Sequence, residues 1–199
     1  MKRAILCLCV LALLAAAGCD DDSSTNDNPE IGIIMKLAVG NRWTYEITLL
    51  DSLGNILSVD TDYTHIYRDT TINNERWYVI SDESPLKVNS MLTHRDDGLW
   101  ACGPPESMLA KYPADIYDTW TDGNGYHRFW LRAKGVTVTV PKGTFSTYKY
   151  VRKSSDGLGP DSCLFYYAPG YGQVKSRFWP DDDDRVEYRT ELIDMVLNY

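Results

Sequence analysis

Apolar and polar residues alternate with a period of two along most of the chain after residue 37. In residues 43–49, for example, every second residue is aromatic or aliphatic, and the residues between them are Thr or Glu. This pattern is typical of a β-strand that buries one face. A helical period extends nowhere for more than two turns, so the pattern favours an all-β fold.

Turn residues divide the rest of the chain into similar segments. They predict strands at residues 56–69, 75–81, 88–95, 99–102, 126–133, 136–140, 145–154, 162–168, 173–179 and 185–197. Residues 103–120 break this rhythm, with three prolines and no alternation. We expect a long Pro-rich loop there, with at most one helical turn at residues 106–111, and loops of this length are often functional.

The strand pattern predicts a single antiparallel domain over residues 37–199. About ten strands with short connections fit a meander that closes into an incomplete, half-open barrel. A sandwich of two sheets is the alternative.

Composition narrows the range of partners. The chain has 199 residues and a formal net charge of −8 at pH 7, and it contains no basic cluster. Proteins that bind nucleic acid neutralise its phosphates with Lys and Arg, so a nucleic-acid partner is not expected. Any attachment to a membrane must therefore come from another feature of the chain.

The N-terminus supplies such a feature. It has two cations, a short apolar run and small residues before Cys19, which is the layout of a secretory signal peptide. The Ala-Ala-Gly-Cys sequence that ends at Cys19 resembles the lipobox of bacterial lipoproteins, in which this cysteine is lipidated and becomes the new N-terminus. A transmembrane helix needs about 20 apolar residues, more than this run offers. An ordinary secreted protein is the alternative if Cys19 is not recognised.

We therefore expect three regions: a leader (residues 1–18), a lipidated tether (19–36) and the β domain (37–199). Residues 20–30 contain no aliphatic or aromatic side chain, so the tether should be disordered. Acyl chains such as palmitate on Cys19 would anchor the protein to a membrane of a bacterial cell envelope. The sequence does not distinguish the inner membrane from the outer one, or the periplasm from the cell surface.

Cysteine usage suggests a disulfide. Cys7 and Cys9 leave with the leader and Cys19 is lipidated, so only Cys102 and Cys163 remain. Export leads to an oxidising compartment, and we expect these two residues to be joined. Two separate thiols are the alternative.

The sequence offers no clear catalytic or metal-binding set. His65, His94 and His127 are the only histidines, and they lack the paired spacing of zinc ligands. No Ser lies in a nucleophile elbow. The four Asp at residues 181–184 are typical of a solvated hairpin tip, with a calcium site as the alternative. We expect no enzyme activity, no catalytic residue, no metal and no cofactor.

Aromatic side chains are abundant, with fourteen Tyr and six Trp. They either fill the barrel core or line a concave apolar pocket with the Pro-rich loop at its mouth. The candidate ligand-binding residues for such a pocket are Trp43, Tyr45, Tyr63, Tyr67, Trp130, Tyr148 and Tyr166.

Three motifs resemble a known family. Residues 37–45 (LAVGNRWTY) are similar to a PLxVGNxWxY opening, residues 140–145 (VPKGTF) to VPAGTF, and residues 166–175 (YYAPGYGQVK) to YYAPGVGLVK. Together they resemble the TapB-like group of domains of unknown function in bacterial lipoproteins, over most of residues 37–199. The chain departs from that pattern at Met35, Lys36 and Lys142. The resemblance implies an antiparallel sheet curled into an incomplete barrel, similar in shape to the LolA and LolB lipoprotein carriers, and it supplies no catalytic residues.

These observations favour a non-enzymatic lipoprotein of the cell envelope whose curved sheet binds an apolar ligand. Lipids, acyl chains and hydrophobic protein segments all fit that description. The alternative is a structural or assembly subunit that offers sheet edges, or residues 103–120, to another envelope protein.

Overall fold

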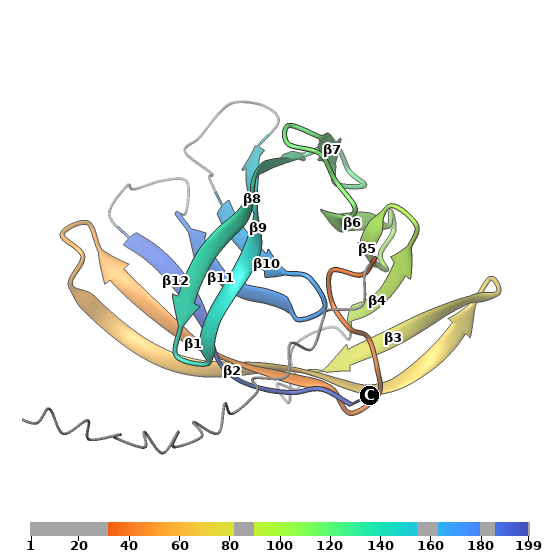
Figure 1. The fold of residues 1–199 in the computed structure, drawn as a ribbon, viewed down its shortest axis with the longest axis horizontal. Helices are drawn as coiled ribbons and strands as arrows, with labels where there is room; N and C mark the ends of the chain where they lie inside the picture. Colours follow the sequence, from red (N-terminus) through yellow and green to blue (C-terminus); the bar gives the residue numbers. More distant parts are fainter. Residues whose placement is uncertain (1–31, 82–89, 155–162, 180–185, 199) are drawn as a thin grey trace, which may run out of the picture.

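Twelve antiparallel strands form one continuous sheet that curls into a nearly closed barrel (Figure 1). The computed structural model describes residues 32–81, 90–154, 163–179 and 186–198, and these ranges contain no helix. The predicted all-β fold, the antiparallel meander and the incomplete barrel are confirmed.

The strands follow one another around the barrel in sequence order, and β1 pairs with β12 to join the two halves. Their bounds are β1 Arg42–Asp51, β2 Ile56–Ile72, β3 Glu75–Ser81, β4 Ser90–Arg95, β5 Gly98–Ala101, β6 Ser107–Lys111, β7 Thr119–Thr121, β8 His127–Val140, β9 Gly143–Ser154, β10 Cys163–Ala168, β11 Gly172–Phe178 and β12 Val186–Val196. The strands expected at residues 126–133 and 136–140 are one strand, β8, with two shifts of register.

The barrel is open at one seam, between β6 and β7, which are the two edges of the sheet. Side chains hold this seam in place of a backbone ladder. The Trp120 Nε1–H donates to the Met108 carbonyl at 3.0 Å, and the Gly123 N–H donates to the Ser107 hydroxyl at 3.1 Å. A Cβ at residue 123 would lie 2.3 Å from the Glu106 carbonyl oxygen, so glycine lets the two edges approach.

Residues 103–120, predicted to be a long loop, contain β6 and the start of β7. The helical turn predicted at residues 106–111 is wrong, because Ser107–Lys111 is an edge strand. Proline lacks an N–H donor and is tolerated beside an edge strand, so Pro105 and Pro113 can flank β6. The prediction failed because a strand of 5 residues is too short to show alternation.

The segment before β1 crosses the barrel interior and connects two distant parts of the wall (Figure 1, orange). On one side the Gly172 N–H donates to the Ile34 carbonyl at 3.0 Å. On the other side His94 Nε2 on β4 hydrogen-bonds to the Met35 carbonyl. Ile34 is fully buried and Met35 is 6% exposed, so we call residues 33–36 the cross-brace of the barrel.

The cross-brace begins before residue 37, the predicted start of the domain. The sequence pattern assigns residues 33–36 to the tether because strand alternation begins only after residue 37, although the acidic segment ends at Glu30 and the residues that follow it are mostly apolar. The leader, Cys19, the other tether residues up to 31, and the acidic run at residues 181–184 lie outside the described residues. Within the described ranges, no helix is long and apolar enough to span a membrane.

The core packs against this cross-brace. It includes the buried side chains of Trp43, Ile66, Leu99, Leu131 and Tyr150, which come from opposite walls of the barrel. Strand alternation brings them to one face of the sheet, which we call the inner face. The other face is the outer face.

The three motifs of the sequence meet at one end of the barrel. The Trp43 indole N–H donates to the Tyr171 carbonyl at 2.6 Å, and the Phe145 ring meets the Tyr171 ring edge-on, with centroids 5.6 Å apart. Asn41 is fully buried, and its Oδ1 accepts the Asn198 N–H at 2.6 Å near the C-terminus. These motif positions therefore hold the cross-brace and the segment around Asn198 in place.

The predicted disulfide is absent, because Cys102 and Cys163 are separate thiols. Six strands lie between β5, which Cys102 follows, and β10, which begins at Cys163. Arg152 Nη2–H donates to Cys163 Sγ at 3.0 Å. Export to an oxidising compartment makes a disulfide chemically possible. The bond also requires that the two Cα atoms lie about 4.4–6.8 Å apart, and export does not bring them together.

We predict that His94 makes stability depend on pH. Burial lowers the pKa of His94, and its hydrogen bonds to Met35 and Gly98 only partly oppose this effect. The folded-state pKa is then below the unfolded value of about 6.5. Stability is complete above that unfolded value and is lost as pH falls through the folded-state pKa, by at most about 1.4 kcal/mol per pH unit.

Urea unfolding at a series of pH values measures this dependence. His94→Gln should flatten the decline below about pH 6.5, while the control His65→Gln should keep it. An unchanged slope in His94→Gln would contradict the prediction.

Candidate functional site

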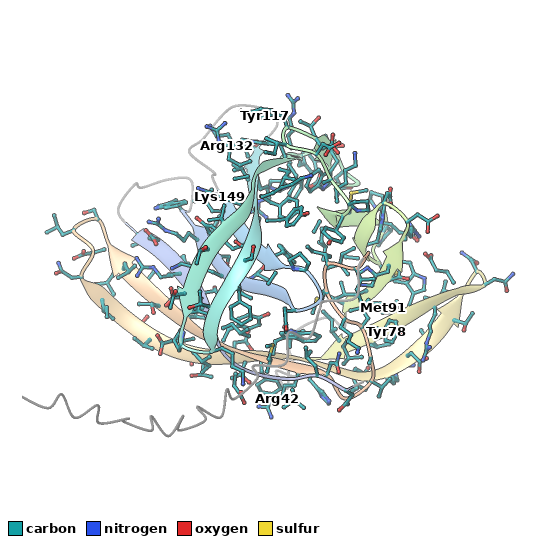
Figure 2. All side chains as sticks on the ribbon, viewed as in Figure 1. Arg42, Tyr78, Met91, Tyr117, Arg132 and Lys149 are labelled. Carbon is teal, nitrogen blue, oxygen red and sulfur yellow. The ribbon has the colours of Figure 1, made fainter. Side chains whose placement is uncertain are left out.

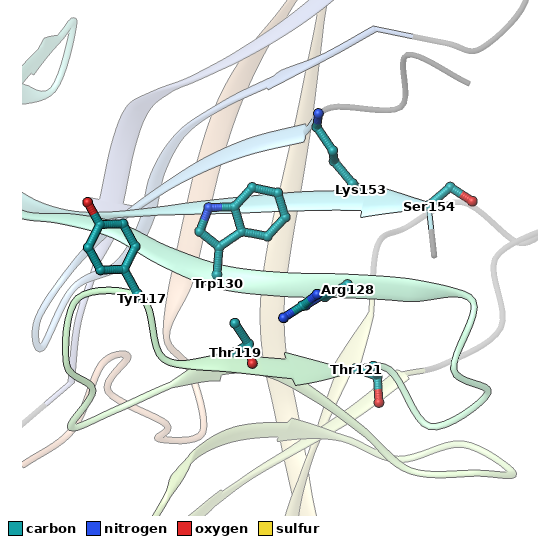
Figure 3. Close-up of a pocket in the computed structure, with 7 residues that line it drawn as sticks. All are labelled: Tyr117, Thr119, Thr121, Arg128, Trp130, Lys153 and Ser154. Atoms are coloured by element: carbon teal, nitrogen blue, oxygen red, sulfur yellow. The ribbon is translucent and has the colours of Figure 1, made fainter. Parts of the chain in front are cut away.

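The candidate site is a hollow of about 600 Å³ on the outer face of β7, β8 and β9, at the seam end of the sheet. We call it the seam pocket. Its described lining is Tyr117, Thr119, Thr121, Arg128, Trp130, Lys153 and Ser154 (Figure 3).

Strand register explains why the lining side chains of β7 and β8, together with Lys153 of β9, share a face. Thr119 of β7 pairs with Trp130 of β8. One step along, Thr121 pairs with Arg128, which in turn pairs with Lys153 of β9. Directly opposed residues in an antiparallel ladder point to the same side of the sheet. Three strands thus place one aromatic ring and two cations side by side.

The alternate residues point inward and support the pocket from behind. Trp120 and Phe129 stack with centroids 5.5 Å apart and planes 9° apart. Trp120 also meets Tyr150 edge-on at 5.7 Å. Aromatic pairs of this kind contribute beyond their buried area, so the backbone that carries Trp130 rests on a packed layer.

Tyr117 lies on a constrained turn at the rim. Its φ is 74°, a left-handed conformation that is costly for a residue with a side chain. Its N–H donates to the Leu131 carbonyl at 2.8 Å. The Asp118 carboxylate accepts the Asp115 N–H and pairs with Lys111, both at 3.0 Å. This turn holds the Tyr117 ring 68% exposed.

The same contacts favour the ionised form of Asp118. Its pKa is lowered, first by the backbone hydrogen bond from Asp115 and then by Lys111. The carboxylate therefore stays charged at neutral pH, and the turn that presents Tyr117 keeps its ion pair.

The electrostatics of the seam pocket differ from those of the whole chain. Arg128 and Lys153 are exposed cations, and none of the described lining residues is a carboxylate, although the chain carries a net charge of −8. Trp130 and Tyr117 offer ring faces, and the Thr and Ser hydroxyls can donate or accept hydrogen bonds. This combination suits an anion that also has an apolar or ring-shaped part.

A second hollow, of about 410 Å³, adjoins the motif cluster and has neutral walls. Its lining is Thr144, Phe145, Ser146, Tyr148, Ala168, Pro169, Tyr171 and Met195. It lacks the charged groups that would orient a ligand, so we place the candidate site in the seam pocket.

An exposed apolar patch marks the tip of the β1–β2 hairpin, which projects from the barrel at the left of Figure 1. Leu53 is 85% exposed, and Ile56, Leu57 and Val59 are each more than half exposed. The Asp51 carboxylate accepts the Leu53 N–H at 2.9 Å and also binds Asn55. The turn is therefore internally satisfied and fixed, and we call it the apolar finger.

The structure does not bring the seven predicted aromatic residues into one pocket. Trp43 and Tyr45 are in the core, where the Tyr45 hydroxyl donates to the Gln173 carbonyl at 3.0 Å. Burial raises the pKa of Tyr45, so its hydroxyl remains a donor. Tyr63 lies on the outer face under Arg42, whose guanidinium is 4.3 Å from the ring centroid.

The other four are spread over the molecule. Tyr67 lies at a register shift between β2 and β3 and is exposed. Tyr148 lines the second hollow, Tyr166 lines a groove beside β8, and Trp130 lines the seam pocket. Figure 2 shows Tyr117 of the seam pocket and Arg42, which covers Tyr63, at opposite ends of the view.

Sequence reasoning missed Tyr117, Arg128 and Lys153. A signal was available for one of them, because Arg128 and Trp130 alternate with Phe129 and share a strand face. Tyr117 and Lys153 gave no such signal, since their approach depends on the register of β8 with its neighbours.

No group of three or more His, Cys, Asp or Glu side chains in the described ranges is arranged to hold a metal ion. His65 and His94 lie on β2 and β4. His127 Nδ1 hydrogen-bonds to the Asp122 carboxylate at 2.7 Å at the start of β8. The three histidines thus lie on three different strands.

Comparison with solved structures identifies the architecture. The crystal structure of a predicted exported protein of Bacteroides fragilis with a YmcC-like fold matches with a TM-score of 0.51 and 10% identity, over 83% of this chain and 100% of that one. A predicted lipoprotein of Parabacteroides distasonis matches with a TM-score of 0.48 and 15% identity, over 84% and 100%. No family model and no curated protein matches the sequence. At 10% identity the first likeness shows the fold alone.

Proposed function

We propose that this protein is a lipid-anchored component of a bacterial cell envelope that binds an anionic, partly apolar ligand in the seam pocket. It acts as a binding module rather than an enzyme. The observation that carries the proposal is that the Trp130 ring, Arg128 and Lys153 line one hollow whose described lining has no carboxylate.

The geometry of the barrel supports an outer site over an inner one. Cross-brace and core side chains occupy the inner face, including Ile34, Trp43 and Tyr150, which are fully buried. The seam pocket, in contrast, is open to solvent and already shaped by strand register. A ligand can reach it without displacing core residues, and the cost of reorganisation on binding is then small.

The chemistry of the pocket selects the ligand class. A ring or acyl segment gains from contact with Trp130, and an acidic group gains charge-assisted hydrogen bonds from Arg128. Acidic amphiphiles and acidic ring compounds combine both features. The net negative charge of the chain would discourage anions over most of its surface, so a local cationic site such as this pocket would be selective for them.

We predict that anilinonaphthalene sulfonate, a fluorescent anion, binds the pocket. Trp130→Ala should weaken this binding about tenfold, which corresponds to about 1.4 kcal/mol for a lost ring contact. The double variant Arg128→Met with Lys153→Met should weaken it to a similar extent. Fluorescence titration of the soluble Cys19→Ala protein measures both effects.

Phenylnaphthylamine, the neutral counterpart of that probe, separates charge from ring contact. It should respond to Trp130→Ala but not to the Arg128 and Lys153 variants. Tyr126→Ala is the matched control, because this ring is 69% exposed and lies outside the described lining. The unfolding midpoints of these variants must match that of the wild type. If the Trp130→Ala variant bound both probes with wild-type affinity, the assignment of the binding site to the seam pocket would be refuted.

The lipid anchor at Cys19 is tested independently of ligand binding. We predict that Cys19→Ala moves the protein from the membrane fraction to the soluble fraction, because the described ranges offer no membrane-spanning helix and the acidic chain should not adhere electrostatically. Fractionation followed by immunoblotting measures this. The control Cys9→Ala changes only a leader cysteine and should leave the protein anchored. Retention of Cys19→Ala on washed membranes would contradict the anchor.

A second candidate function is assembly with another envelope protein, and the apolar finger favours it. Exposed apolar clusters that project from a surface are typical of interaction sites. We predict that a photo-crosslinking residue at position 53 captures one recurrent protein in cells, whereas the same residue at exposed Thr71 in the β2–β3 hairpin does not. Leu57→Ser should reduce the capture several-fold. Capture of lipid alone, or of many unrelated proteins, would contradict this function.

A further inference from the structure

Part of β8 has an unpaired backbone edge. β7 pairs with β8 only at Arg128–Trp130, and the turn at Tyr117 and Asp118 continues the contact to Leu131. From residue 132 to 140, β8 pairs with β9 on one side, and no strand of the described chain pairs with it on the other. An open strand edge can accept a further strand.

The direction of the unpaired groups follows from the hydrogen bonds. The Thr147 hydroxyl on β9 donates to the Val136 carbonyl at 2.8 Å, so that carbonyl points toward β9. Residues of an antiparallel strand point their N–H and C=O groups to alternate sides. Thr137 and Thr139 therefore direct these groups away from β9, into the open edge, and both side chains are exposed.

A groove of about 420 Å³ runs along this edge. Val136, Thr137, Val138 and Thr139 are four consecutive residues that line it. Successive side chains of a strand point to opposite faces, so a run of four in one groove means that the strand edge itself forms the wall. We call this feature the β8 groove.

The floor of the β8 groove is cationic. Tyr166, Lys175, Arg177 and Arg189 come from the outer faces of β10, β11 and β12. Lys175 pairs with Glu191 at 2.6 Å.

Arg189 is the cation with the weakest pairing. Both nitrogens of Arg177 bind Glu187, at 2.8 and 2.7 Å. Arg189 reaches the same carboxylate only at 3.4 Å, and its side chain is 36% exposed. A carboxylate from outside could therefore form a closer pair with Arg189 than the one that Glu187 forms at 3.4 Å.

We propose that the β8 groove binds an extended acidic segment of a partner protein as an added β-strand. Backbone groups of Thr137 and Thr139 pair with the segment, and one of its carboxylates contacts Arg189. The charge of the floor favours an acidic segment over a second copy of this chain, since two copies would bring their cationic floors together. This inference does not depend on the seam pocket.

A peptide of about six residues that alternates Val and Glu is the probe, since this length spans the four groove residues in an extended conformation. Fluorescence anisotropy with the full chain in detergent should detect binding, and the same peptide with Lys in place of Glu should bind at least about tenfold more weakly. Thr137→Pro should reduce binding at least about tenfold, because it removes one outward N–H. Proline is tolerated at an open edge, so the fold should persist.

Thr137→Val is the matched control, because it keeps the N–H and should bind like the wild type. Arg189→Gln should weaken binding about fivefold and reduce its salt dependence. Hydrogen exchange at the amides of Thr137 and Thr139 should slow in the complex. No binding, equal binding of the Lys peptide, or unchanged binding by Thr137→Pro overturns the proposal. A dimer of the free chain that Thr137→Pro abolishes also overturns it, in favour of self-association.

Discussion

The cross-brace is the constraint on which the rest of the barrel depends. A closed barrel joins its two edges through a hydrogen-bonded ladder, but β6 and β7 lack such a ladder and are connected through side chains such as Trp120. Contacts inside the barrel compensate for the missing ladder between β6 and β7. Ile34 and Met35 bridge β11 and β4 by backbone carbonyls, so opposite walls are held together without closure at the seam.

This arrangement determines where binding chemistry can lie. The inner face is occupied by the cross-brace and by core rings such as Tyr150, so it offers packing rather than open surface. The outer face and the incomplete strand pairings remain. β7 pairs with only three residues of β8, and elements with few pairings open most easily. The seam pocket thus lies beside the short strand β7, on the face of the sheet that the core leaves open.

Much of the fold was predictable because alternation is a local property. The bounds of β3, and the cores of β1, β9 and β12, follow from the residues themselves. Two features of the fold could not be predicted from the local sequence pattern. β6 is too short for its pattern to be visible, and the cross-brace depends on partners such as Gly172 that lie far along the chain.

The candidate site was less predictable for the same reason. Tyr63 and Tyr67 share a face in a regular strand, but a register shift between Ile66 and Arg68 separates them. Aromatic content also does not distinguish a core ring such as Trp43 from a pocket ring such as Trp130. That distinction requires knowing which side of each strand faces the core.

β8 connects the two proposed binding surfaces. Its first half pairs with β7 and carries Trp130, whereas its second half extends beyond β7 and exposes the edge at Thr137 and Thr139. Two register shifts between Leu131 and Val136 separate the halves, and such irregularities bend and twist a strand locally. A strand of 14 residues can therefore serve two surfaces of different chemistry. The second half of β8 lies beside β11 and β12, since Lys142 just after it donates its N–H to the Leu192 carbonyl at 3.1 Å, and its residues line the groove together with side chains of those two strands.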